Sequence, residues 1–297
     1  MQNLPLFSFQ PAHKNLHIYS TFIQDKLTLV QDRLFFTVGT KIEHNNYTGV
    51  EFSPSGHLAW TVTHHQMIWA AVSRAVRTPS RIDRDFSLYA VPGVPIITGD
   101  DFISETLLAY ELGWRVRPFE RVSLSLAGFY NVYDDIRSAE PGPPPSGFPI
   151  SFANGVKGNA YGIEFSGAYQ PVEFWRLRGG YTFLKKKLSV KPGSQDLNKA
   201  SAESNDPENQ FVIQSMFDLP AHIEAGFVIR YVDALPDPKV PAYTGLDIQV
   251  AWKLTKNLEL SVSGQNLLNN RHPEFIPTSP SPREILRSFN GMLTCRF

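Results

Sequence analysis

Hydrophobic and polar residues alternate with a period of two along most of the chain. Successive side chains of a β-strand point to opposite faces of its sheet, so this pattern predicts strands with one apolar face and one mainly small or polar face. Further runs of the same kind begin at Leu108, Leu246 and Leu258. The longest apolar register is the series Val122, Leu124, Leu126, Gly128, Tyr130 and Val132.

Such segments recur about thirteen times, which predicts an all-β chain. Many are longer than the ~5 to 6 residues of an ordinary soluble strand and approach the ~9 to 11 that cross a bilayer at a tilt. Their length therefore favours strands that span a membrane. The expected strands are 16–29, 33–44, 49–62, 66–76, 103–116, 120–137, 157–170, 174–189, 209–219, 221–232, 241–254, 258–267 and 287–297.

The connections between the expected strands alternate strictly between short and long from residue 63 onward. The short connections are 30–32, 63–65, 117–119, 171–173, 220 and 255–257. The long connections are 77–102, 138–156, 190–208, 233–240 and 268–286, and the connection 45–48 is the one short exception among them.

This segregation of connection lengths discriminates between two all-β architectures. In an antiparallel meander, alternate connections lie at the same end, and outer-membrane barrels have short periplasmic turns and longer external loops. A soluble β-sandwich also alternates its faces, but it has little reason to separate its connections by length. We therefore predict a single domain over residues 1–297, an antiparallel up-and-down transmembrane β-barrel.

Composition changes this prediction little. Lys and Arg number 28, as do Asp and Glu, so the charge balance gives no reason to expect a nucleic-acid partner. Apolar residues make up 42% of a chain whose mean hydropathy is slightly negative, as expected when half of each strand faces water. Five tryptophans lie on apolar registers, namely Trp60, Trp69, Trp114, Trp175 and Trp252. They would suit the aromatic girdles of a barrel, and they fit ordinary core packing equally well.

The sequence predicts neither a metal site nor a bound cofactor. Cys295 is the single cysteine, so the chain has no internal disulfide and no cysteine pair with metal-ligand spacing. His64 and His65 are adjacent in an expected tight turn, where neighbouring side chains of an extended chain point apart. Residues 1–15 lack the basic start and the apolar run of a secretory signal, so no export signal is expected in this chain.

Four segments resemble TonB-dependent outer-membrane receptors. Residues 264–275 read GQNLLNNRHPEF, which resembles the penultimate strand and loop of that family. Residues 69–81, WAAVSRAVRTPSR, resemble a strand that rises into a long external loop. Residues 104–115, SETLLAYELGWR, and 124–138, LSLAGFYNVYDDIRS, resemble the hairpin that follows. The resemblance extends from about Leu16 to Phe297.

The resemblance implies a barrel of about 22 strands with an N-terminal plug, of which this chain corresponds to about the last 13. Such receptors reside in the outer membrane of Gram-negative bacteria, are energised by the inner-membrane TonB complex, and import iron chelates, cobalamin or other scarce nutrients. No plug or TonB-box segment is recognised here, so a partial barrel with two open edges is expected, either a fragment or a truncated gene product. Phe289, Leu293 and Phe297 resemble the terminal strand that barrel assembly machinery recognises.

Within this resemblance, the residues expected to contact a small metal chelate or cofactor ligand are Arg74, Arg77, Arg81, Arg84, Phe148, Arg271 and His272. Guanidinium groups at a barrel mouth would attract anionic ferric siderophores. In the alternative interpretation Arg74 faces the lumen and pairs with wall carboxylates such as Glu105, Glu111 or Glu164, while the loop charges are simply solvated. Phe148, at the tip of the proline-rich segment 140–149, equally fits an extended solvent loop.

The sequence contains no nucleophile elbow, zinc-protease helix, P-loop or Rossmann glycine pattern, so an enzyme is not expected. The preferred hypothesis is an importer wall, surrounded by outer-membrane lipid, that takes up a scarce nutrient such as a ferric siderophore. Two alternatives remain open. One is a plugless structural or adhesin-like barrel, and the other is an outer-membrane lipid hydrolase with Ser and His on its outer wall.

Overall fold

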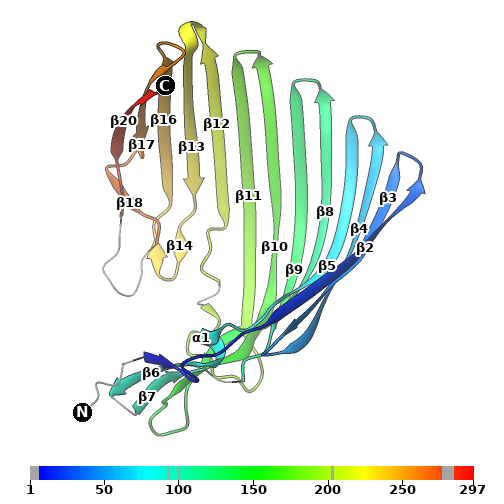
Figure 1. Cartoon of the computed structure of the whole chain (residues 1–297), viewed down its shortest axis with the longest axis vertical. Coiled ribbons are helices and arrows are strands. Elements are labelled where there is room, and N and C mark those ends of the chain that lie inside the picture. Colours follow the sequence, from blue (N-terminus) through cyan, green and yellow to red (C-terminus); the bar gives the residue numbers. More distant parts are fainter. Residues whose placement is uncertain (1–6, 92–93, 100, 202–203, 276–283) are drawn as a thin grey trace.

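The computed structural model describes residues 7–91, 94–99, 101–201, 204–275 and 284–297. Within these residues, thirteen strands pair with their neighbours in sequence order to form one antiparallel meander, which confirms the predicted fold class. Figure 1 shows them side by side as a curved, open wall. They are β2 (Ile18–Val30), β3 (Leu34–Asn45), β4 (Gly49–Thr63), β5 (Gln66–Arg77), β8 (Glu105–Phe119), β9 (Val122–Glu140), β10 (Ile150–Val172), β11 (Trp175–Val190), β12 (Asn209–Leu219), β13 (Ile223–Val232), β16 (Tyr243–Lys253), β17 (Leu258–Gln265) and β20 (Ser288–Cys295).

With one exception, the short turns lie at one end of the wall and the longer connections at the other, as predicted (Figure 1). The one short connection at the long-connection end joins β3 to β4. There the Asn45 side chain accepts hydrogen bonds from the backbone N–H groups of Tyr47 and Thr48, each at 2.9 Å. At the opposite end, the 3₁₀ turn η2 (Pro220–His222) joins β12 to β13, so β13 begins two residues later than predicted.

The long connections are more structured than the sequence indicated. The segment predicted as a plain loop between β5 and β8 holds α1 (Arg81–Arg84), β6 (Phe86–Val91) and β7 (Val94–Thr98). Strand β6 pairs with β1 (Phe7–Phe9), which was not predicted. Strand β7 pairs with the first residues of β10, and this pairing extends β10 seven residues beyond its predicted start at 157.

Two further connections contain small hairpins. Strands β14 (Leu235–Pro236) and β15 (Lys239–Val240) form one of them. Strands β18 (Arg271–Pro273) and β19 (Glu284–Leu286) form the other, within the stretch 268–286 that was predicted to be a loop.

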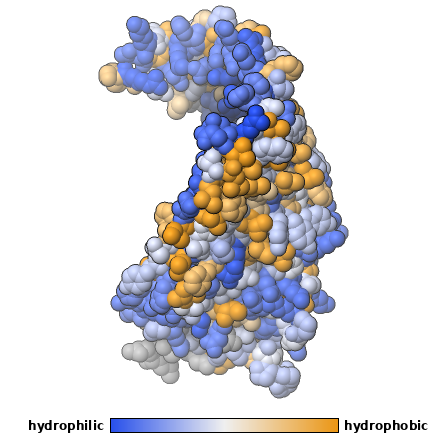
Figure 2. All heavy atoms as spheres, turned by 90° about the vertical axis from the view of Figure 1, so that its right-hand side faces the viewer, coloured by the Kyte–Doolittle hydropathy of each residue, from blue (hydrophilic) through white to orange (hydrophobic). Residues whose placement is uncertain are grey.

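The two faces of the sheet differ as the alternation predicts. Leu112, Leu126 and Val250 lie on one face and are exposed, and we call this face the apolar face. Glu111 and Ser125 lie on the other, the polar face. Figure 2 shows hydrophobic residues gathered in a band across the middle of one side of the molecule, with hydrophilic residues above and below. Such a band is the arrangement that a membrane-spanning wall requires.

Two expectations about individual side chains on these faces are wrong. Trp69 was placed on an apolar register, but it lies opposite Gly113 on the polar face, where a Cβ on Gly113 would come within 2.5 Å of the indole ring. The alternative interpretation placed Arg74 on the lumen side with a carboxylate partner, but Arg74 lies opposite Leu108 on the apolar face. Its guanidinium donates to the backbone carbonyl of Phe52.

Fully buried apolar side chains are few among the described residues. One cluster, formed by Ile136, Val156 and Ala200, lies where β9 and β10 approach the connection after β11. The wall is therefore held together mainly by the hydrogen bonds between its strands. No helix in the described part of the chain is long and apolar enough to cross a membrane.

Candidate functional site

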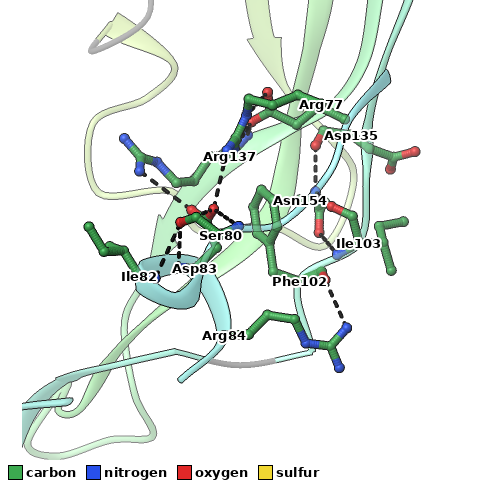
Figure 3. A network of polar contacts seen from close by, with 11 residues as sticks. Arg77, Ser80, Ile82, Asp83, Arg84, Phe102, Ile103, Asp135, Arg137 and Asn154 are labelled. Carbon is green, nitrogen blue, oxygen red and sulfur yellow. Dashed lines mark hydrogen bonds and ion pairs between the residues drawn. The ribbon is translucent and has the colours of Figure 1, made fainter. Parts of the chain in front are cut away.

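The predicted site begins with the short helix α1, which the local sequence caps at its first turn. The Ser80 hydroxyl accepts hydrogen bonds from the backbone N–H groups of Ile82 and Asp83. In return the Asp83 carboxylate accepts from the Ser80 backbone N–H and hydroxyl, each at 2.8 Å. This reciprocal capping box, drawn in Figure 3, fixes the direction in which Asp83 points.

Asp83 joins α1 to the wall. Its side chain is only 1% exposed, and its two oxygens lie 3.1 Å from Arg77 of β5 and 3.6 Å from Arg137 of β9. Burial alone would raise the pKa of Asp83. The hydrogen bonds from Ser80 and the charge of Arg77 outweigh that effect and hold the pKa of this carboxyl below its usual value. Arg77 also makes a bidentate pair with Glu105, with both contacts at 2.6 Å.

Asp85, at the end of α1, anchors the N-terminal segment in the same way. It accepts hydrogen bonds from Lys14 at 2.8 Å, from the Tyr47 hydroxyl at 2.7 Å and from Arg81 at 3.2 Å. Burial opposes ionisation of Asp85, but these donors prevail and lower its pKa. Burial, together with the hydrogen bond to Asp85, raises the pKa of Tyr47 to about 12.

The end of the same connection is fastened by backbone contacts. Arg84 donates to the carbonyl of Phe102 at 3.1 Å and pairs with Asp101 at 3.0 Å. Phe102 is completely buried, and the Arg77 guanidinium lies 5.2 Å from its ring centroid. Asn154 of β10 exchanges two hydrogen bonds with the backbone of Ile103 (Figure 3). We call this assembly, the described residues of 77–104 with Lys14, Tyr47, Arg137 and Asn154, the arginine cap.

The structure thus brings together Arg77, Arg81 and Arg84, three of the predicted site residues. The expectation that these charges are simply solvated is wrong, since each guanidinium has a carboxylate partner. Arg137 was missed because its contact with Asp83 joins positions 54 residues apart and depends on strand register. Arg74 is separated from the cap arginines by its position on the apolar face.

The other three predicted residues lie in other connections. Phe148 is half-exposed in the turn between β9 and β10. His272 is buried, stacked 4.1 Å from the Tyr243 ring, with its ring nitrogens 3.1 Å from Asn266 and from Glu274. Arg271 is exposed and pairs with Glu284 at 3.2 Å. His272 is therefore a packed side chain and not an open ligand group.

Two arginines that the prediction did not select lie on the polar face. Arg115 of β8 faces Ser125, and Arg178 of β11 faces Ala168. They border a hollow of about 390 Å³ whose floor also includes Ser123 and Ser166. Neither guanidinium has a hydrogen bond or ion pair with the described residues. Three strand spacings separate them, about 14 Å across the sheet.

The arrangement suits the binding of an anion better than that of a bare metal ion. Among the described residues, no group of three or more His, Cys, Asp or Glu side chains is placed to hold a metal ion. Free guanidinium groups, by contrast, bind carboxylate or phenolate oxygens through charge-assisted hydrogen bonds. The lack of an acidic partner for Arg115 and Arg178 among the described residues depends on strand register, so only the structure shows it.

A wide antiparallel membrane wall, with long structured connections at one end and a polar inner face, defines an outer-membrane transport barrel. Residues 3–267 match the family model described as TonB dependent receptor-like, beta-barrel. The chain belongs to this family. Its members and structural neighbours are receptors and transporters of the Gram-negative outer membrane, not enzymes, so the apolar face meets lipid and the polar face lines the lumen. The long-connection end is the external one.

Individual relatives are similar at low identity. The metal-pseudopaline receptor CntO of Pseudomonas aeruginosa is 23% identical over 189 residues, which cover 60% of this chain and 26% of that protein. Crystal structures of the P. aeruginosa ferric enterobactin receptor PfeA (mutant G324V) and the Acinetobacter baumannii siderophore receptor PirA superpose with TM-scores of 0.75 and 0.74, at 18% and 16% identity. Each covers 95% of this chain, which spans 45% and 46% of their lengths, and they show the fold.

Proposed function

We propose that this chain forms part of the translocation wall and ligand-capturing mouth of a TonB-dependent importer for an anionic metal chelate, such as a ferric siderophore. The family membership supports import, and the names of the similar receptors support a metal chelate as cargo. Energy would come from the TonB complex acting through a plug domain that this chain does not resemble, so the proposal concerns the whole receptor.

The observation that carries the proposal is that two lumen-facing arginines, Arg115 and Arg178, have no hydrogen bond or ion pair with the described residues. Both guanidinium groups are exposed to the lumen, so an anionic chelate passing along the wall could reach them and accept charge-assisted hydrogen bonds. The serine floor between them offers hydroxyl groups and no bulky side chain to obstruct passage. Capture at the mouth would involve the cap residues Arg81 and Arg84, with the exposed Phe148 as an aromatic contact.

Uptake of a radiolabelled ferric chelate tests the role of the lumen pair. The whole receptor that contains this chain would be expressed in a Gram-negative strain deleted for its own siderophore receptors. We expect the double variant Arg115→Gln/Arg178→Gln to import an anionic chelate about a hundredfold more slowly at limiting concentration, because two charge-assisted contacts are lost. The variant Arg74→Gln, on the lipid face, is the matched control. Normal uptake by the double variant would contradict the proposal.

A separate binding measurement tests the mouth. Arg81→Gln/Arg84→Gln receptors on intact cells should bind the chelate more weakly, although each arginine must first exchange its present carboxylate partner for the ligand. Arg271→Gln, in the exposed β18–β19 hairpin, would show whether that connection contributes as well. An unchanged dissociation constant in the Arg81→Gln/Arg84→Gln variant would show that the arginine cap does not contribute to ligand capture.

The terminal strand supports a second partner. Phe289 and Leu293 lie opposite Gly264 and Leu260 on the apolar face, and both are exposed. Phe297 follows the strand and is also exposed. This presentation suits recognition by the barrel assembly machinery. Replacing Phe297 with Ser should lower the amount of heat-modifiable barrel in outer-membrane fractions, and an unchanged amount would contradict that role.

A further inference from the structure

Three tyrosines form a continuous row on the lipid face. Tyr110 of β8 lies opposite Tyr130 of β9, which lies opposite Tyr161 of β10. The Tyr130 and Tyr161 rings stack with their centroids 6.4 Å apart. Tyrosine places an apolar ring and a polar hydroxyl at one level, so a row of this kind marks the boundary between hydrocarbon and headgroups.

The position of the row along β10 agrees with this boundary. From Tyr161 to Tyr169, the exposed aromatic residue near the short-turn end, β10 advances eight residues, about 26 Å along the strand. At a tilt of about 40° this corresponds to a height of about 20 Å, close to the apolar band of about 25 Å found on such barrels. The row therefore lies at the external leaflet.

Below the row, on the hydrocarbon side, the wall is hollowed. Gly128 occupies the next position on β9, between Leu112 of β8 and Ile163 of β10, and contributes no side chain. Leu112 is 60% exposed and Ile163 is about half exposed, so they rise on either side of the glycine. The resulting hollow has a volume of about 830 Å³ and an almost entirely apolar lining, which also includes Trp114 and Phe183.

Lysines stand beside and above the row. Lys185 of β11 lies opposite Tyr161, and Lys187 lies one step further toward the external end, opposite Asn159. The Lys187 ammonium is 5.6 Å from the Tyr161 ring centroid, and it has no acidic partner among the described residues. Lys185 pairs with Glu208, which offsets its charge. Lys186, between them, points to the lumen face and pairs with Asp206 at 2.7 Å.

We propose that this surface, Lys187 with the Tyr130–Tyr161 pair and the hollow over Gly128, binds one phosphorylated glycolipid of the external leaflet. Lys187 would hold a phosphate, the phenol groups would lie at the headgroup, and an acyl chain would fill the hollow between Leu112 and Ile163. The argument rests on charge complementarity at the level where a phosphate lies and on an apolar hollow directly beneath it. A glycolipid is favoured over a phospholipid because the external leaflet of this membrane is built of phosphorylated glycolipid.

The test uses the whole receptor, purified in mild detergent and placed in phosphatidylcholine nanodiscs that contain diphosphorylated lipid A as a minor component. Native mass spectrometry would count retained lipid A. We expect Lys187→Gln to bind about tenfold more weakly, since one charge-assisted contact is lost. Lys186→Gln, one residue away on the lumen face, should bind as the wild type does. Gly128→Leu, which fills the hollow, should also weaken binding. Leu112→Ala, which removes one side of the hollow, should weaken binding too and carries less risk to folding.

Several results would overturn the proposal. One is unchanged retention in Lys187→Gln, and another is an equal loss in Lys186→Gln. Equal retention of dephosphorylated lipid A would exclude the phosphate contact, and equal retention of phosphatidylglycerol would exclude a glycolipid-specific site. Heat-modifiability on gels identifies any variant that has not folded, and unchanged binding by folded Gly128→Leu and Leu112→Ala would show that no acyl chain occupies the hollow.

Discussion

Replacing Asp83 with Ala should release the arginine cap from the wall without unfolding the barrel. The substitution removes the carboxylate that accepts from the Ser80 backbone, the Ser80 hydroxyl and Arg77. It also leaves Arg137 without its contact at 3.6 Å. Because Asp83 joins α1 to both β5 and β9, its loss should act on the cap before it acts on the sheet.

The magnitude follows from the environment of each partner. Removing one member of a buried ion pair typically costs about 3 to 5 kcal/mol. Here Arg77 is 45% exposed and keeps its bidentate pair with Glu105, so the lower limit applies, about 3 kcal/mol of local stability. Since 1.4 kcal/mol is a factor of ten, backbone amides that exchange by opening of the cap should exchange about a hundredfold faster.

Hydrogen–deuterium exchange measured by mass spectrometry gives the assay. Peptides from 78–91 should gain deuterium faster in Asp83→Ala, whereas peptides from β12 and β13 should not change. Asp101→Ala is the matched control, because Asp101 pairs with Arg84 but its side chain is 96% exposed, and surface pairs contribute little. The reasoning is refuted if the cap peptides exchange at the wild-type rate, or if β12 and β13 accelerate equally.

Three further outcomes are expected. Leu126→Arg, on the lipid face near the middle of the band, should lower the free energy of unfolding in vesicles by about 2 to 4 kcal/mol. Ser125→Arg, on the lumen face, should lower it much less, and equal urea midpoints for the two variants would contradict the assignment of faces. Asp85 has a lowered pKa, so the stability that its ionised carboxylate contributes is complete above about pH 4 and is lost as the pH falls further. After correction for the change in intrinsic exchange rate, peptides from 78–91 should therefore exchange faster at about pH 3 than at neutral pH. Ser215→Ala leaves the Trp175 indole N–H without its acceptor at 2.9 Å and should cost about 1 kcal/mol by fluorescence-monitored unfolding, with no change counting against that hydrogen bond.

The strands were predictable because membrane and lumen impose opposite requirements on alternate side chains. That constraint is local, so the registers of Leu112 and Leu126 could be read from the sequence. The prediction of faces fails where a side chain packs against or hydrogen-bonds to a neighbouring strand. Trp69 is apolar yet faces the lumen because it covers Gly113. Arg74 is charged yet lies on the apolar face, at a level beyond the tyrosine row and therefore outside the hydrocarbon. There β4 and β5 have stopped pairing beyond Ser73, and the guanidinium reaches the open carbonyl of Phe52.

The arginine cap was predictable only as a concentration of charge. Its geometry depends on contacts between distant positions, such as Asp85 with Lys14 and Asp83 with Arg137, which no local pattern reports. The same holds for the lumen pair. Arg115 and Arg178 occupy polar registers like many others, and their lack of an acidic partner follows from the register of four strands together.

Strand β10 is 23 residues long, more than twice the length needed to cross the membrane. The part from Ile150 to Tyr161 extends beyond the tyrosine row, which at about 3.3 Å per residue and a tilt of about 40° gives a ridge that rises about 25 to 30 Å above the hydrocarbon. A molecule approaching from outside the cell would meet this ridge before it reached the lumen. So would an antibody, because this hairpin lies at the external end of the wall.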